Sequence, residues 1–230
     1  MRRLHFMVEG PSEKEFVDNL LAEHFAQFGT ICDARLVTSS RDWSSGRFYK
    51  GGITSYGKLR YEIVEAVRRD HSADSFFTTF LDLYGLPSEF PGVEVANEAD
   101  PRRRVSSIEL AFQRDIQNCL PEIDIASHFI PNIICHEFEA LVLADVMKLG
   151  CVYLDRHEDL LQLASQVAHI GDPELVNSSP ETSPSKRIIK LIPEYDKATA
   201  GPLAAIEIGL PTLRKQCSHF NEWVTRLEGL

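Results

Sequence analysis

Short apolar runs alternate along this chain with segments whose apolar residues recur every three or four positions. The runs at residues 4–8, 76–81 and 129–135 have the length and the β-branched and aromatic content of strands. The segment 16–28 has the spacing of an amphipathic helix, and residues 31–38 form a weaker candidate strand. Further helices are expected at 56–67, 105–116 and 140–147. This alternation of strand and helix predicts an α/β fold with a mostly parallel central sheet flanked by helices.

The last third of the chain has a different pattern, in which no strand is expected. Helical spacing recurs at residues 160–167, 203–208 and 213–227. With 230 residues, 43% of them hydrophobic, and no linker-like segment, the chain is expected to bury one sizeable core. We therefore expect an α/β core over residues 1–150 and a helical C-terminal extension over 151–230 that packs on the same domain.

The first strand ends on a carboxylate. Residues 4–8 lead into Glu9, a turn follows, and Ser12 with Glu15 has the spacing of a capping box at the start of the next helix. A carboxylate at the C-terminal end of a strand and beside a helix start lies where open α/β sheets bind ligands and ions.

Acids recur in the same position at two later strands. Asp82 follows the strand at 76–81, Glu137 and Glu139 follow the strand at 129–135, and Glu13 lies in the first turn after Glu9. Any one of them taken alone is more often a solvated or capping carboxylate. In a parallel sheet, however, the C-terminal strand ends share one edge, so the five acids can converge there. Clustered oxygen ligands select Mg²⁺ or Mn²⁺, and without a cation they repel one another.

The spacing of Glu137 and Glu139 leaves two geometries open. If the chain there is extended, both side chains point to the same side; in a helix they lie about 200° apart. The conformation of this turn therefore decides whether both acids serve one site.

Charge and composition limit the candidate functions. The net charge is −10 and the pI about 5.3, which argues against a large basic surface for nucleic acid but not against a small site whose metal ions supply positive charge. The loop at 39–52 is the densest mixture of bases and aromatics, and it is either an ordered surface loop or a contact with substrate or partner. It carries Arg41, Trp43, Arg47, Phe48, Tyr49 and Lys50. The run at 102–104 is read as a solvated face.

Other classes of protein are disfavoured. The five cysteines are scattered and include no CxxC pair, which argues against a disulfide scaffold or a zinc module and favours a reducing cytoplasm. No apolar run approaches the roughly 20 residues of a membrane span, and no signal-peptide core is expected. Neither a phosphate-binding P-loop nor a Gly-x-Ser-x-Gly elbow is present. The protein is therefore expected to be soluble and cytoplasmic, without membrane association or ATPase activity of its own.

Four stretches together resemble a known family. They are VEGPSE at 8–13, LDLYGLP at 81–87, HEFEAL at 136–141 and PSKR at 184–187. They resemble the Toprim-like domain-of-unknown-function family 4276, and more widely the Toprim nucleases of the overcoming-lysogenization-defect group. The resemblance covers nearly the whole chain and implies a Toprim-like core over residues 1–150.

What the resemblance implies is two-metal phosphodiester chemistry. By analogy all five strand-end acids would be ligands of one or two Mg²⁺ or Mn²⁺ ions, and Glu9 would also be the candidate general base. Lys186 is the best counterpart of the lysine that follows the acids in these nucleases. Metals activate water and stabilise the charge that builds on the attacked phosphate, and a lysine adds to that stabilisation. Arg187 joins Arg41, Arg47 and Lys50 as a candidate nucleic-acid contact.

Similar Toprim domains often act with a separately encoded P-loop ATPase in defence against phage. The leading prediction is thus a metal-dependent nuclease, with DNA or RNA as substrate, controlled by such a partner. The chain departs from the Toprim pattern in two ways: Tyr84 replaces the second acid of the usual Asp-x-Asp, and the later pair is Glu-x-Glu. The alternative is a catalytically degenerate scaffold that acts as a binding or regulatory subunit. A third interpretation is hydrolysis of a small phosphorylated molecule.

Overall fold

A parallel sheet forms the centre of the molecule. The computed structural model describes residues 1–37, 53, 55–96, 98–176 and 182–230. Their strands are β1 (Arg2–Val8), β2 (Thr30–Leu36), β3 (Ser75–Asp82), β4 (Phe129–Ile130) and β5 (Ile133–Ile134). The order is β2-β1-β3-β4, with β5 also paired to β3, and every pairing is parallel. The predicted α/β class is confirmed.

The register brings the C-terminal strand ends into line. Val8, the last residue of β1, pairs with Leu36 and Phe80 on its two neighbours. Asp82, the last residue of β3, pairs with Ile134 at the end of β5. The residues that follow these strands therefore emerge along one edge of the sheet.

Helices cover both faces of the sheet. α3 (Tyr56–Arg69) and α4 (Pro101–Cys119) share a core with Met7, Phe77 and Leu81. The opposite face carries Leu4, Phe6 and Val8, and it is covered by the helices after β1 and by α11 (Ser218–Glu228). The alternation of residues between two cores is the period-2 pattern of a strand buried on both sides.

The helix after β1 differs from the prediction at its start. It runs through α1 (Pro11–Phe16), a π-helical segment η1 (Val17–Leu21) and α2 (Ala22–Ala26). The predicted capping box is wrong: Gly10 is the N-cap, because Pro11 takes the first helical position that its fixed φ suits. The Ser12 hydroxyl instead donates to the main-chain oxygen of Lys197 at 3.1 Å.

Three predicted elements are broken in the structure. The strand expected at 129–135 is split into β4 and β5 by Pro131, which has no N–H to donate to a sheet. The helix expected at 140–147 is α6 (Glu139–Val142) followed by η3 (Leu143–Cys151), with Asp145 outside helical geometry. The helix expected at 213–227 becomes α10 (Leu210–Gln216) and α11, because Cys217 is extended.

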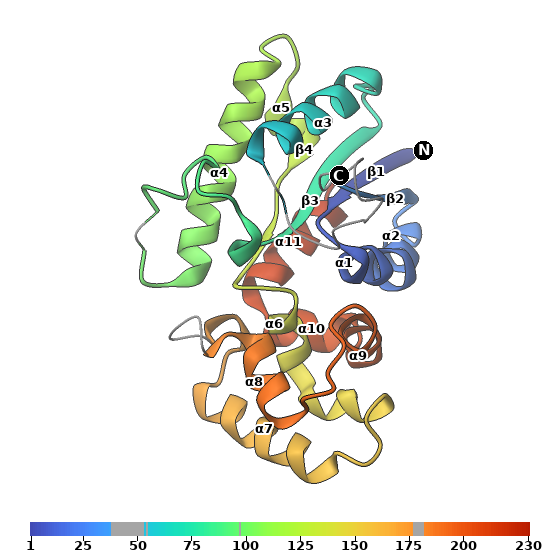
Figure 1. Cartoon of the computed structure of the whole chain (residues 1–230). Coiled ribbons are helices and arrows are strands. Elements are labelled where there is room, and N and C mark those ends of the chain that lie inside the picture. Colours follow the sequence, from blue (N-terminus) through green and yellow to red (C-terminus); the bar gives the residue numbers. More distant parts are fainter. Residues whose placement is uncertain (38–52, 54, 97, 177–181) are drawn as a thin grey trace, which may run out of the picture.

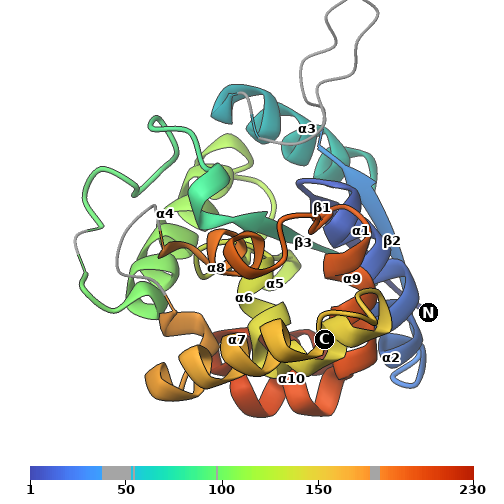
Figure 2. The ribbon, with the colours of Figure 1, turned by 60° about the horizontal axis from the view of Figure 1, so that its bottom comes forward.

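A group of helices lies beyond the C-terminal edge of the sheet, as Figures 1 and 2 show for α6 to α10. The remaining short elements and helices are η2 (Leu83–Gly85), α5 (Ile125–His128), α7 (His157–Ile170), η4 (Pro173–Leu175), α8 (Pro184–Leu191) and α9 (Ala200–Ile208). Apolar residues of α6 to α10 belong to the same core as β1 and α1. The boundary expected at residue 150 stays a prediction. Among the described residues, none of the helices has the length and apolar character needed to cross a bilayer.

Candidate functional site

The five acids expected at strand ends all lie at the C-terminal edge of the sheet. Glu9 follows β1, Glu13 is in the first turn of α1, and Asp82 ends β3. Glu137 lies between β5 and α6, and Glu139 begins α6. The Oε2 atom of Glu9 accepts a hydrogen bond from the main-chain N–H of Asp82 at 3.1 Å, which ties the ends of the two central strands together.

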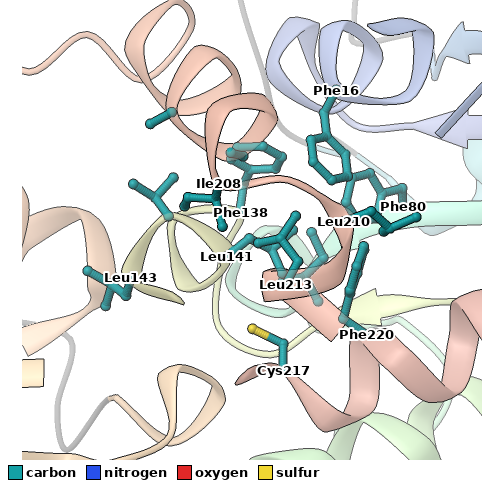
Figure 3. Packing of buried hydrophobic residues seen from close by; sticks show 14 of the residues in the cluster. Phe16, Phe80, Phe138, Leu141, Leu143, Ile208, Leu210, Leu213, Cys217 and Phe220 are labelled. Carbon is teal, nitrogen blue, oxygen red and sulfur yellow. The ribbon is translucent and has the colours of Figure 1, made fainter. Parts of the chain in front are cut away.

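Three aromatic rings hold the elements that carry these acids. Phe16 of α1, Phe80 of β3 and Phe138, between Glu137 and Glu139, gather in one cluster (Figure 3). The ring centroid of Phe16 lies 5.8 Å from that of Phe80 and 5.6 Å from that of Phe138. Both distances are within the range of favourable aromatic pairs. The backbone that presents the acids is therefore fixed by packing.

Two glycines allow the turns to close on the acids. A Cβ atom at Gly85 would collide with the carboxylate of Glu9, and one at Gly10 would lie 2.9 Å from Oε2 of Glu13. The glycines in the two motif-like turns are thus explained by the close approach of main chain to carboxylate.

Burial and mutual repulsion act on most of these acids. Glu13 and Glu139 are 5% and 2% exposed, and burial raises the pKa of each to about 7. Burial also raises the pKa of Asp82 well above its usual range, and the negative charges of the other four acids raise it further. The pKa of Glu9 is raised by burial too. Oδ1 of Asp82 is buried and has no hydrogen-bond partner within the described chain.

Lys197 touches the cluster. Nζ of Lys197 lies 2.8 Å from Oε2 of Glu137 and 3.5 Å from Oε2 of Glu139. Glu137 also accepts a hydrogen bond from the main-chain N–H of Ser185 at 2.7 Å. Burial opposes ionisation of Glu137, but Lys197 and Ser185 outweigh it, so its pKa is lowered. Glu137 is therefore the one acid of the five whose pKa is lowered, although Lys197 also faces Glu139.

The predicted lysine has a different position. Lys186 is exposed on α8, and among described residues no ion pair joins it to the acids. Its predicted role stays a prediction, whereas Lys197 is the lysine in contact. Sequence reasoning missed Lys197 because it lies in a loop outside the motif-like stretches, where nothing local marks it.

The conformation of the turn after β5 determines how the side chains of Glu137 and Glu139 are placed. His136 has a φ of +70°, a left-handed conformation that is uncommon for a residue with a side chain. The N–H of Glu137 bonds to the main-chain oxygen of Cys135 at 3.0 Å, and α6 begins at Glu139. The segment is neither extended nor a regular helix, and both glutamates reach Lys197.

Tyr84, in place of the second acid, pairs with His136. The main-chain N–H of Tyr84 donates to the main-chain oxygen of His136 at 3.0 Å, and the phenol oxygen lies 3.0 Å from Nδ1 of the imidazole. Tyr84 is 47% exposed, in contrast to the buried acids beside it.

The expected nucleic-acid contacts are not tested. Arg41, Arg47 and Lys50 lie outside the described residues. The Nε–H of Arg187 donates to the main-chain oxygen of Thr182 at 2.9 Å, which fixes its side chain at the start of α8. These four assignments remain predictions.

The donor set suits a hard divalent cation. Every ligand candidate is a carboxylate, Oδ1 of Asp82 has no hydrogen-bond partner within the described chain, and burial followed by the charges of neighbouring acids raises the pKa of Asp82 and Glu13. In the described part of the chain, no three His, Cys, Asp or Glu side chains already form a group that could hold a metal ion. Binding a cation would therefore require side-chain rearrangement among the acids.

Comparisons with known proteins give three findings. Residues 8–228 match the family described as a domain of unknown function (DUF4276), which agrees with the resemblance seen in the sequence. No curated protein sequence matches significantly. The solved C-terminal region of the OLD protein of Xanthomonas campestris pv. campestris is similar over 100% of this chain and 99% of its own, with 14% identity and a TM-score of 0.37.

Proposed function

Since the chain belongs to the DUF4276 family, we propose that it is a metal-dependent nuclease of Toprim type, whose strand-end acids bind Mg²⁺ or Mn²⁺. The observation that carries the proposal is the free, buried Oδ1 of Asp82 among four other carboxylates. Such an arrangement destabilises the folded protein unless a cation compensates it. The acids of one sheet edge are therefore best explained as ligands.

Each acid has a role that its surroundings support. Glu9, Glu13, Asp82 and Glu139 lack full compensation and would hold the metal. A bound divalent cation would supply Lewis-acid stabilisation of the phosphodiester and lower the pKa of water. Glu9 bonds to the end of the neighbouring strand and remains the candidate general base.

Lys197 is proposed as the cationic residue of the reaction. Its ammonium group is half-exposed and is oriented toward the edge by Glu137, where it can neutralise the charge that grows on a phosphate in the transition state. Glu137 thus acts as a positioning residue for Lys197. Lys186, exposed on α8, is the alternative candidate for this role, and substitution of each lysine compares the two.

Cleavage by the purified chain tests the proposal. Labelled single- and double-stranded DNA and RNA are incubated with Mn²⁺ or Mg²⁺. We expect cleavage that requires the metal and falls on the order of a hundredfold or more in Glu9→Gln and Asp82→Asn. Asp33→Asn, the same kind of substitution midway along the edge strand β2, is the matched control. Metal-dependent cleavage that survives both acid substitutions contradicts the assignment.

The proposed partner is a separately encoded P-loop ATPase of an antiphage defence system. The support is the sequence resemblance, together with the lack of a P-loop motif in this chain. The test is co-purification of the chain with a P-loop ATPase encoded beside it, followed by cleavage with and without ATP. If the two proteins form no complex and ATP has no effect on cleavage, this part of the proposal is contradicted.

A non-catalytic binding subunit is the second candidate. Two observations favour it: Tyr84 stands in place of an acid, and Lys197 already supplies positive charge to Glu137 and Glu139. On this alternative, partner binding is retained in Glu9→Gln and Asp82→Asn, and no condition gives cleavage.

A further inference from the structure

The three arginines at the start of α4 have different surroundings, although the sequence pattern predicts one solvated face for them. Arg102 is held by Asp100 and by Asp172, at 3.2 and 2.8 Å. Arg103 is exposed. Arg104 lies near Glu98 and close enough to Tyr84 and His136 for its positive charge to act on both.

The guanidinium of Arg104 has an unused donor. Its Nε atom is buried without a hydrogen-bond partner, and no ion pair joins the guanidinium to an acid among the described residues. A guanidinium offers five N–H donors in a planar fork that matches a phosphate group. Unlike Arg102, Arg104 is therefore available to an incoming anion.

Tyr84 provides an exposed aromatic surface at the same place. It lies two positions after Asp82, and its ring is held against His136 with a centroid distance of 5.5 Å. The paired main-chain and side-chain hydrogen bonds to His136 fix the ring in one orientation although nearly half of the residue is exposed. The left-handed φ of His136 is backbone strain of the kind that persists at functional sites.

We propose that Arg104 and Tyr84, positioned by His136, form a subsite for single-stranded nucleic acid beside the acid edge. Arg104 binds a backbone phosphate next to the cleaved one, and Tyr84 stacks on an unpaired base, as in other single-strand binding grooves. The inference rests on the proposed nuclease function and assigns its substrate class. It also gives the residue that replaces the second acid a role of its own.

Binding of a short fluorescent single strand, measured by anisotropy in the Glu9→Gln background with Mn²⁺ present, tests the subsite. We expect Arg104→Ala to weaken binding about tenfold and to reduce the salt dependence by about one phosphate contact. Arg103→Ala removes the same charge from the same turn and is the matched control, expected to change affinity by less than about twofold.

Tyr84 is tested by a pair of variants. We expect Tyr84→Ala to weaken single-strand binding on the order of tenfold and duplex binding much less, whereas Tyr84→Phe retains most of the affinity because it keeps the ring. Unfolding midpoints of all variants establish that each is folded. Equal effects of Tyr84→Phe and Tyr84→Ala would show that the phenol only supports His136, and would overturn the stacking role.

The outcomes separate this inference from the proposed function. If the chain binds single strands through Arg104 but never cleaves, the subsite stands and the proposed catalysis fails. If the unmodified chain cleaves but Arg104→Ala binds as Arg103→Ala does, the subsite fails and the nuclease stands. No binding of any single strand at low salt would also overturn the subsite.

Discussion

Aspartates in two regions of the central sheet have opposite surroundings. Away from the acid edge, Asp33, midway along the edge strand β2, pairs with His5 and with Arg35, and Asp70, which precedes β3, pairs with Arg3 at 2.8 Å. Although burial opposes it, these partners lower the pKa of both aspartates. At the C-terminal end, burial and neighbouring acids raise the pKa of Asp82. Asp33 and Asp70 are thus paired with cationic side chains, whereas Asp82 is surrounded by other acids.

Burial alone does not account for this difference. Glu174 is also buried, and burial raises its pKa, but its carboxylate accepts hydrogen bonds from the main-chain N–H groups of His219 and Phe220, both at 2.9 Å. That acid is satisfied by the start of α11 and serves the fold. Asp82 keeps one oxygen free among carboxylates, and this difference supports our proposal that its edge of the sheet is the functional one.

The largest expected effect on the cleavage rate comes from substituting Lys197, and Lys186 provides the comparison. We expect Lys197→Ala to lower the rate of metal-dependent cleavage by about 10- to 100-fold, because it removes the cation that faces the phosphate. Lys186→Ala removes an exposed lysine from α8 and should leave the rate nearly unchanged. Steady-state cleavage rates of the two variants decide, and the reverse order would return the catalytic role to Lys186.

Matched substitutions of Asp82 and Asp33 compare the effects of the two aspartates on the stability of the protein. Without metal at pH 8, Asp82→Asn is expected to increase the free energy of unfolding by about 1–3 kcal/mol, because burial and the neighbouring acids oppose ionisation of Asp82 in the folded state but not in the unfolded state. Asp33→Asn breaks a partly exposed ion pair and is expected to decrease it by up to about 1 kcal/mol. Urea unfolding measures both. If both substitutions change the free energy of unfolding in the same direction, the contrast between Asp82 and Asp33 is contradicted.

The pH dependence of stability sharpens the same contrast. Burial raises the pKa of Glu13 and Glu139 to about 7 in the folded protein from an ordinary value of 4.5, so the folded state holds more protons between these values. The metal-free protein should therefore lose stability as pH rises from about 4.5 to about 7. Glu13→Gln should reduce that loss by about 1–2 kcal/mol. Urea titrations at several pH values test this, and a stability that is flat or that rises over the window in metal-free protein would contradict it.

The sequence predicted the parallel sheet and the location of the acids because both depend on local patterns. An apolar run followed by an acid, repeated three times, defines strand ends, and parallel strands place their ends together. The break at Pro131 and the loss of the capping box at Pro11 were missed, although proline chemistry explains both.

Lys197 and Arg104 could not be predicted in the same way. The contact of Lys197 with Glu137 depends on how the loop before α9 packs against α1, where Ser12 holds it. Arg102 has acidic ion-pair partners and Arg104 has none among the described residues, because the two side chains lie on different sides of α4 and meet different neighbours. These are long-range consequences of packing, and the sequence carries no local sign of them.

The rise in unfolding temperature caused by a divalent cation tests the central claim most directly. Mn²⁺ or Mg²⁺ at millimolar concentration is added at pH 8 to the unmodified chain, to Asp82→Asn and to Asp33→Asn. The C-terminal edge is a cation site if the midpoint rises for the unmodified chain and for Asp33→Asn but not for Asp82→Asn, because a ligand that binds only the folded state stabilises it. No rise in the unmodified chain, or an equal rise in Asp82→Asn, would contradict the assignment.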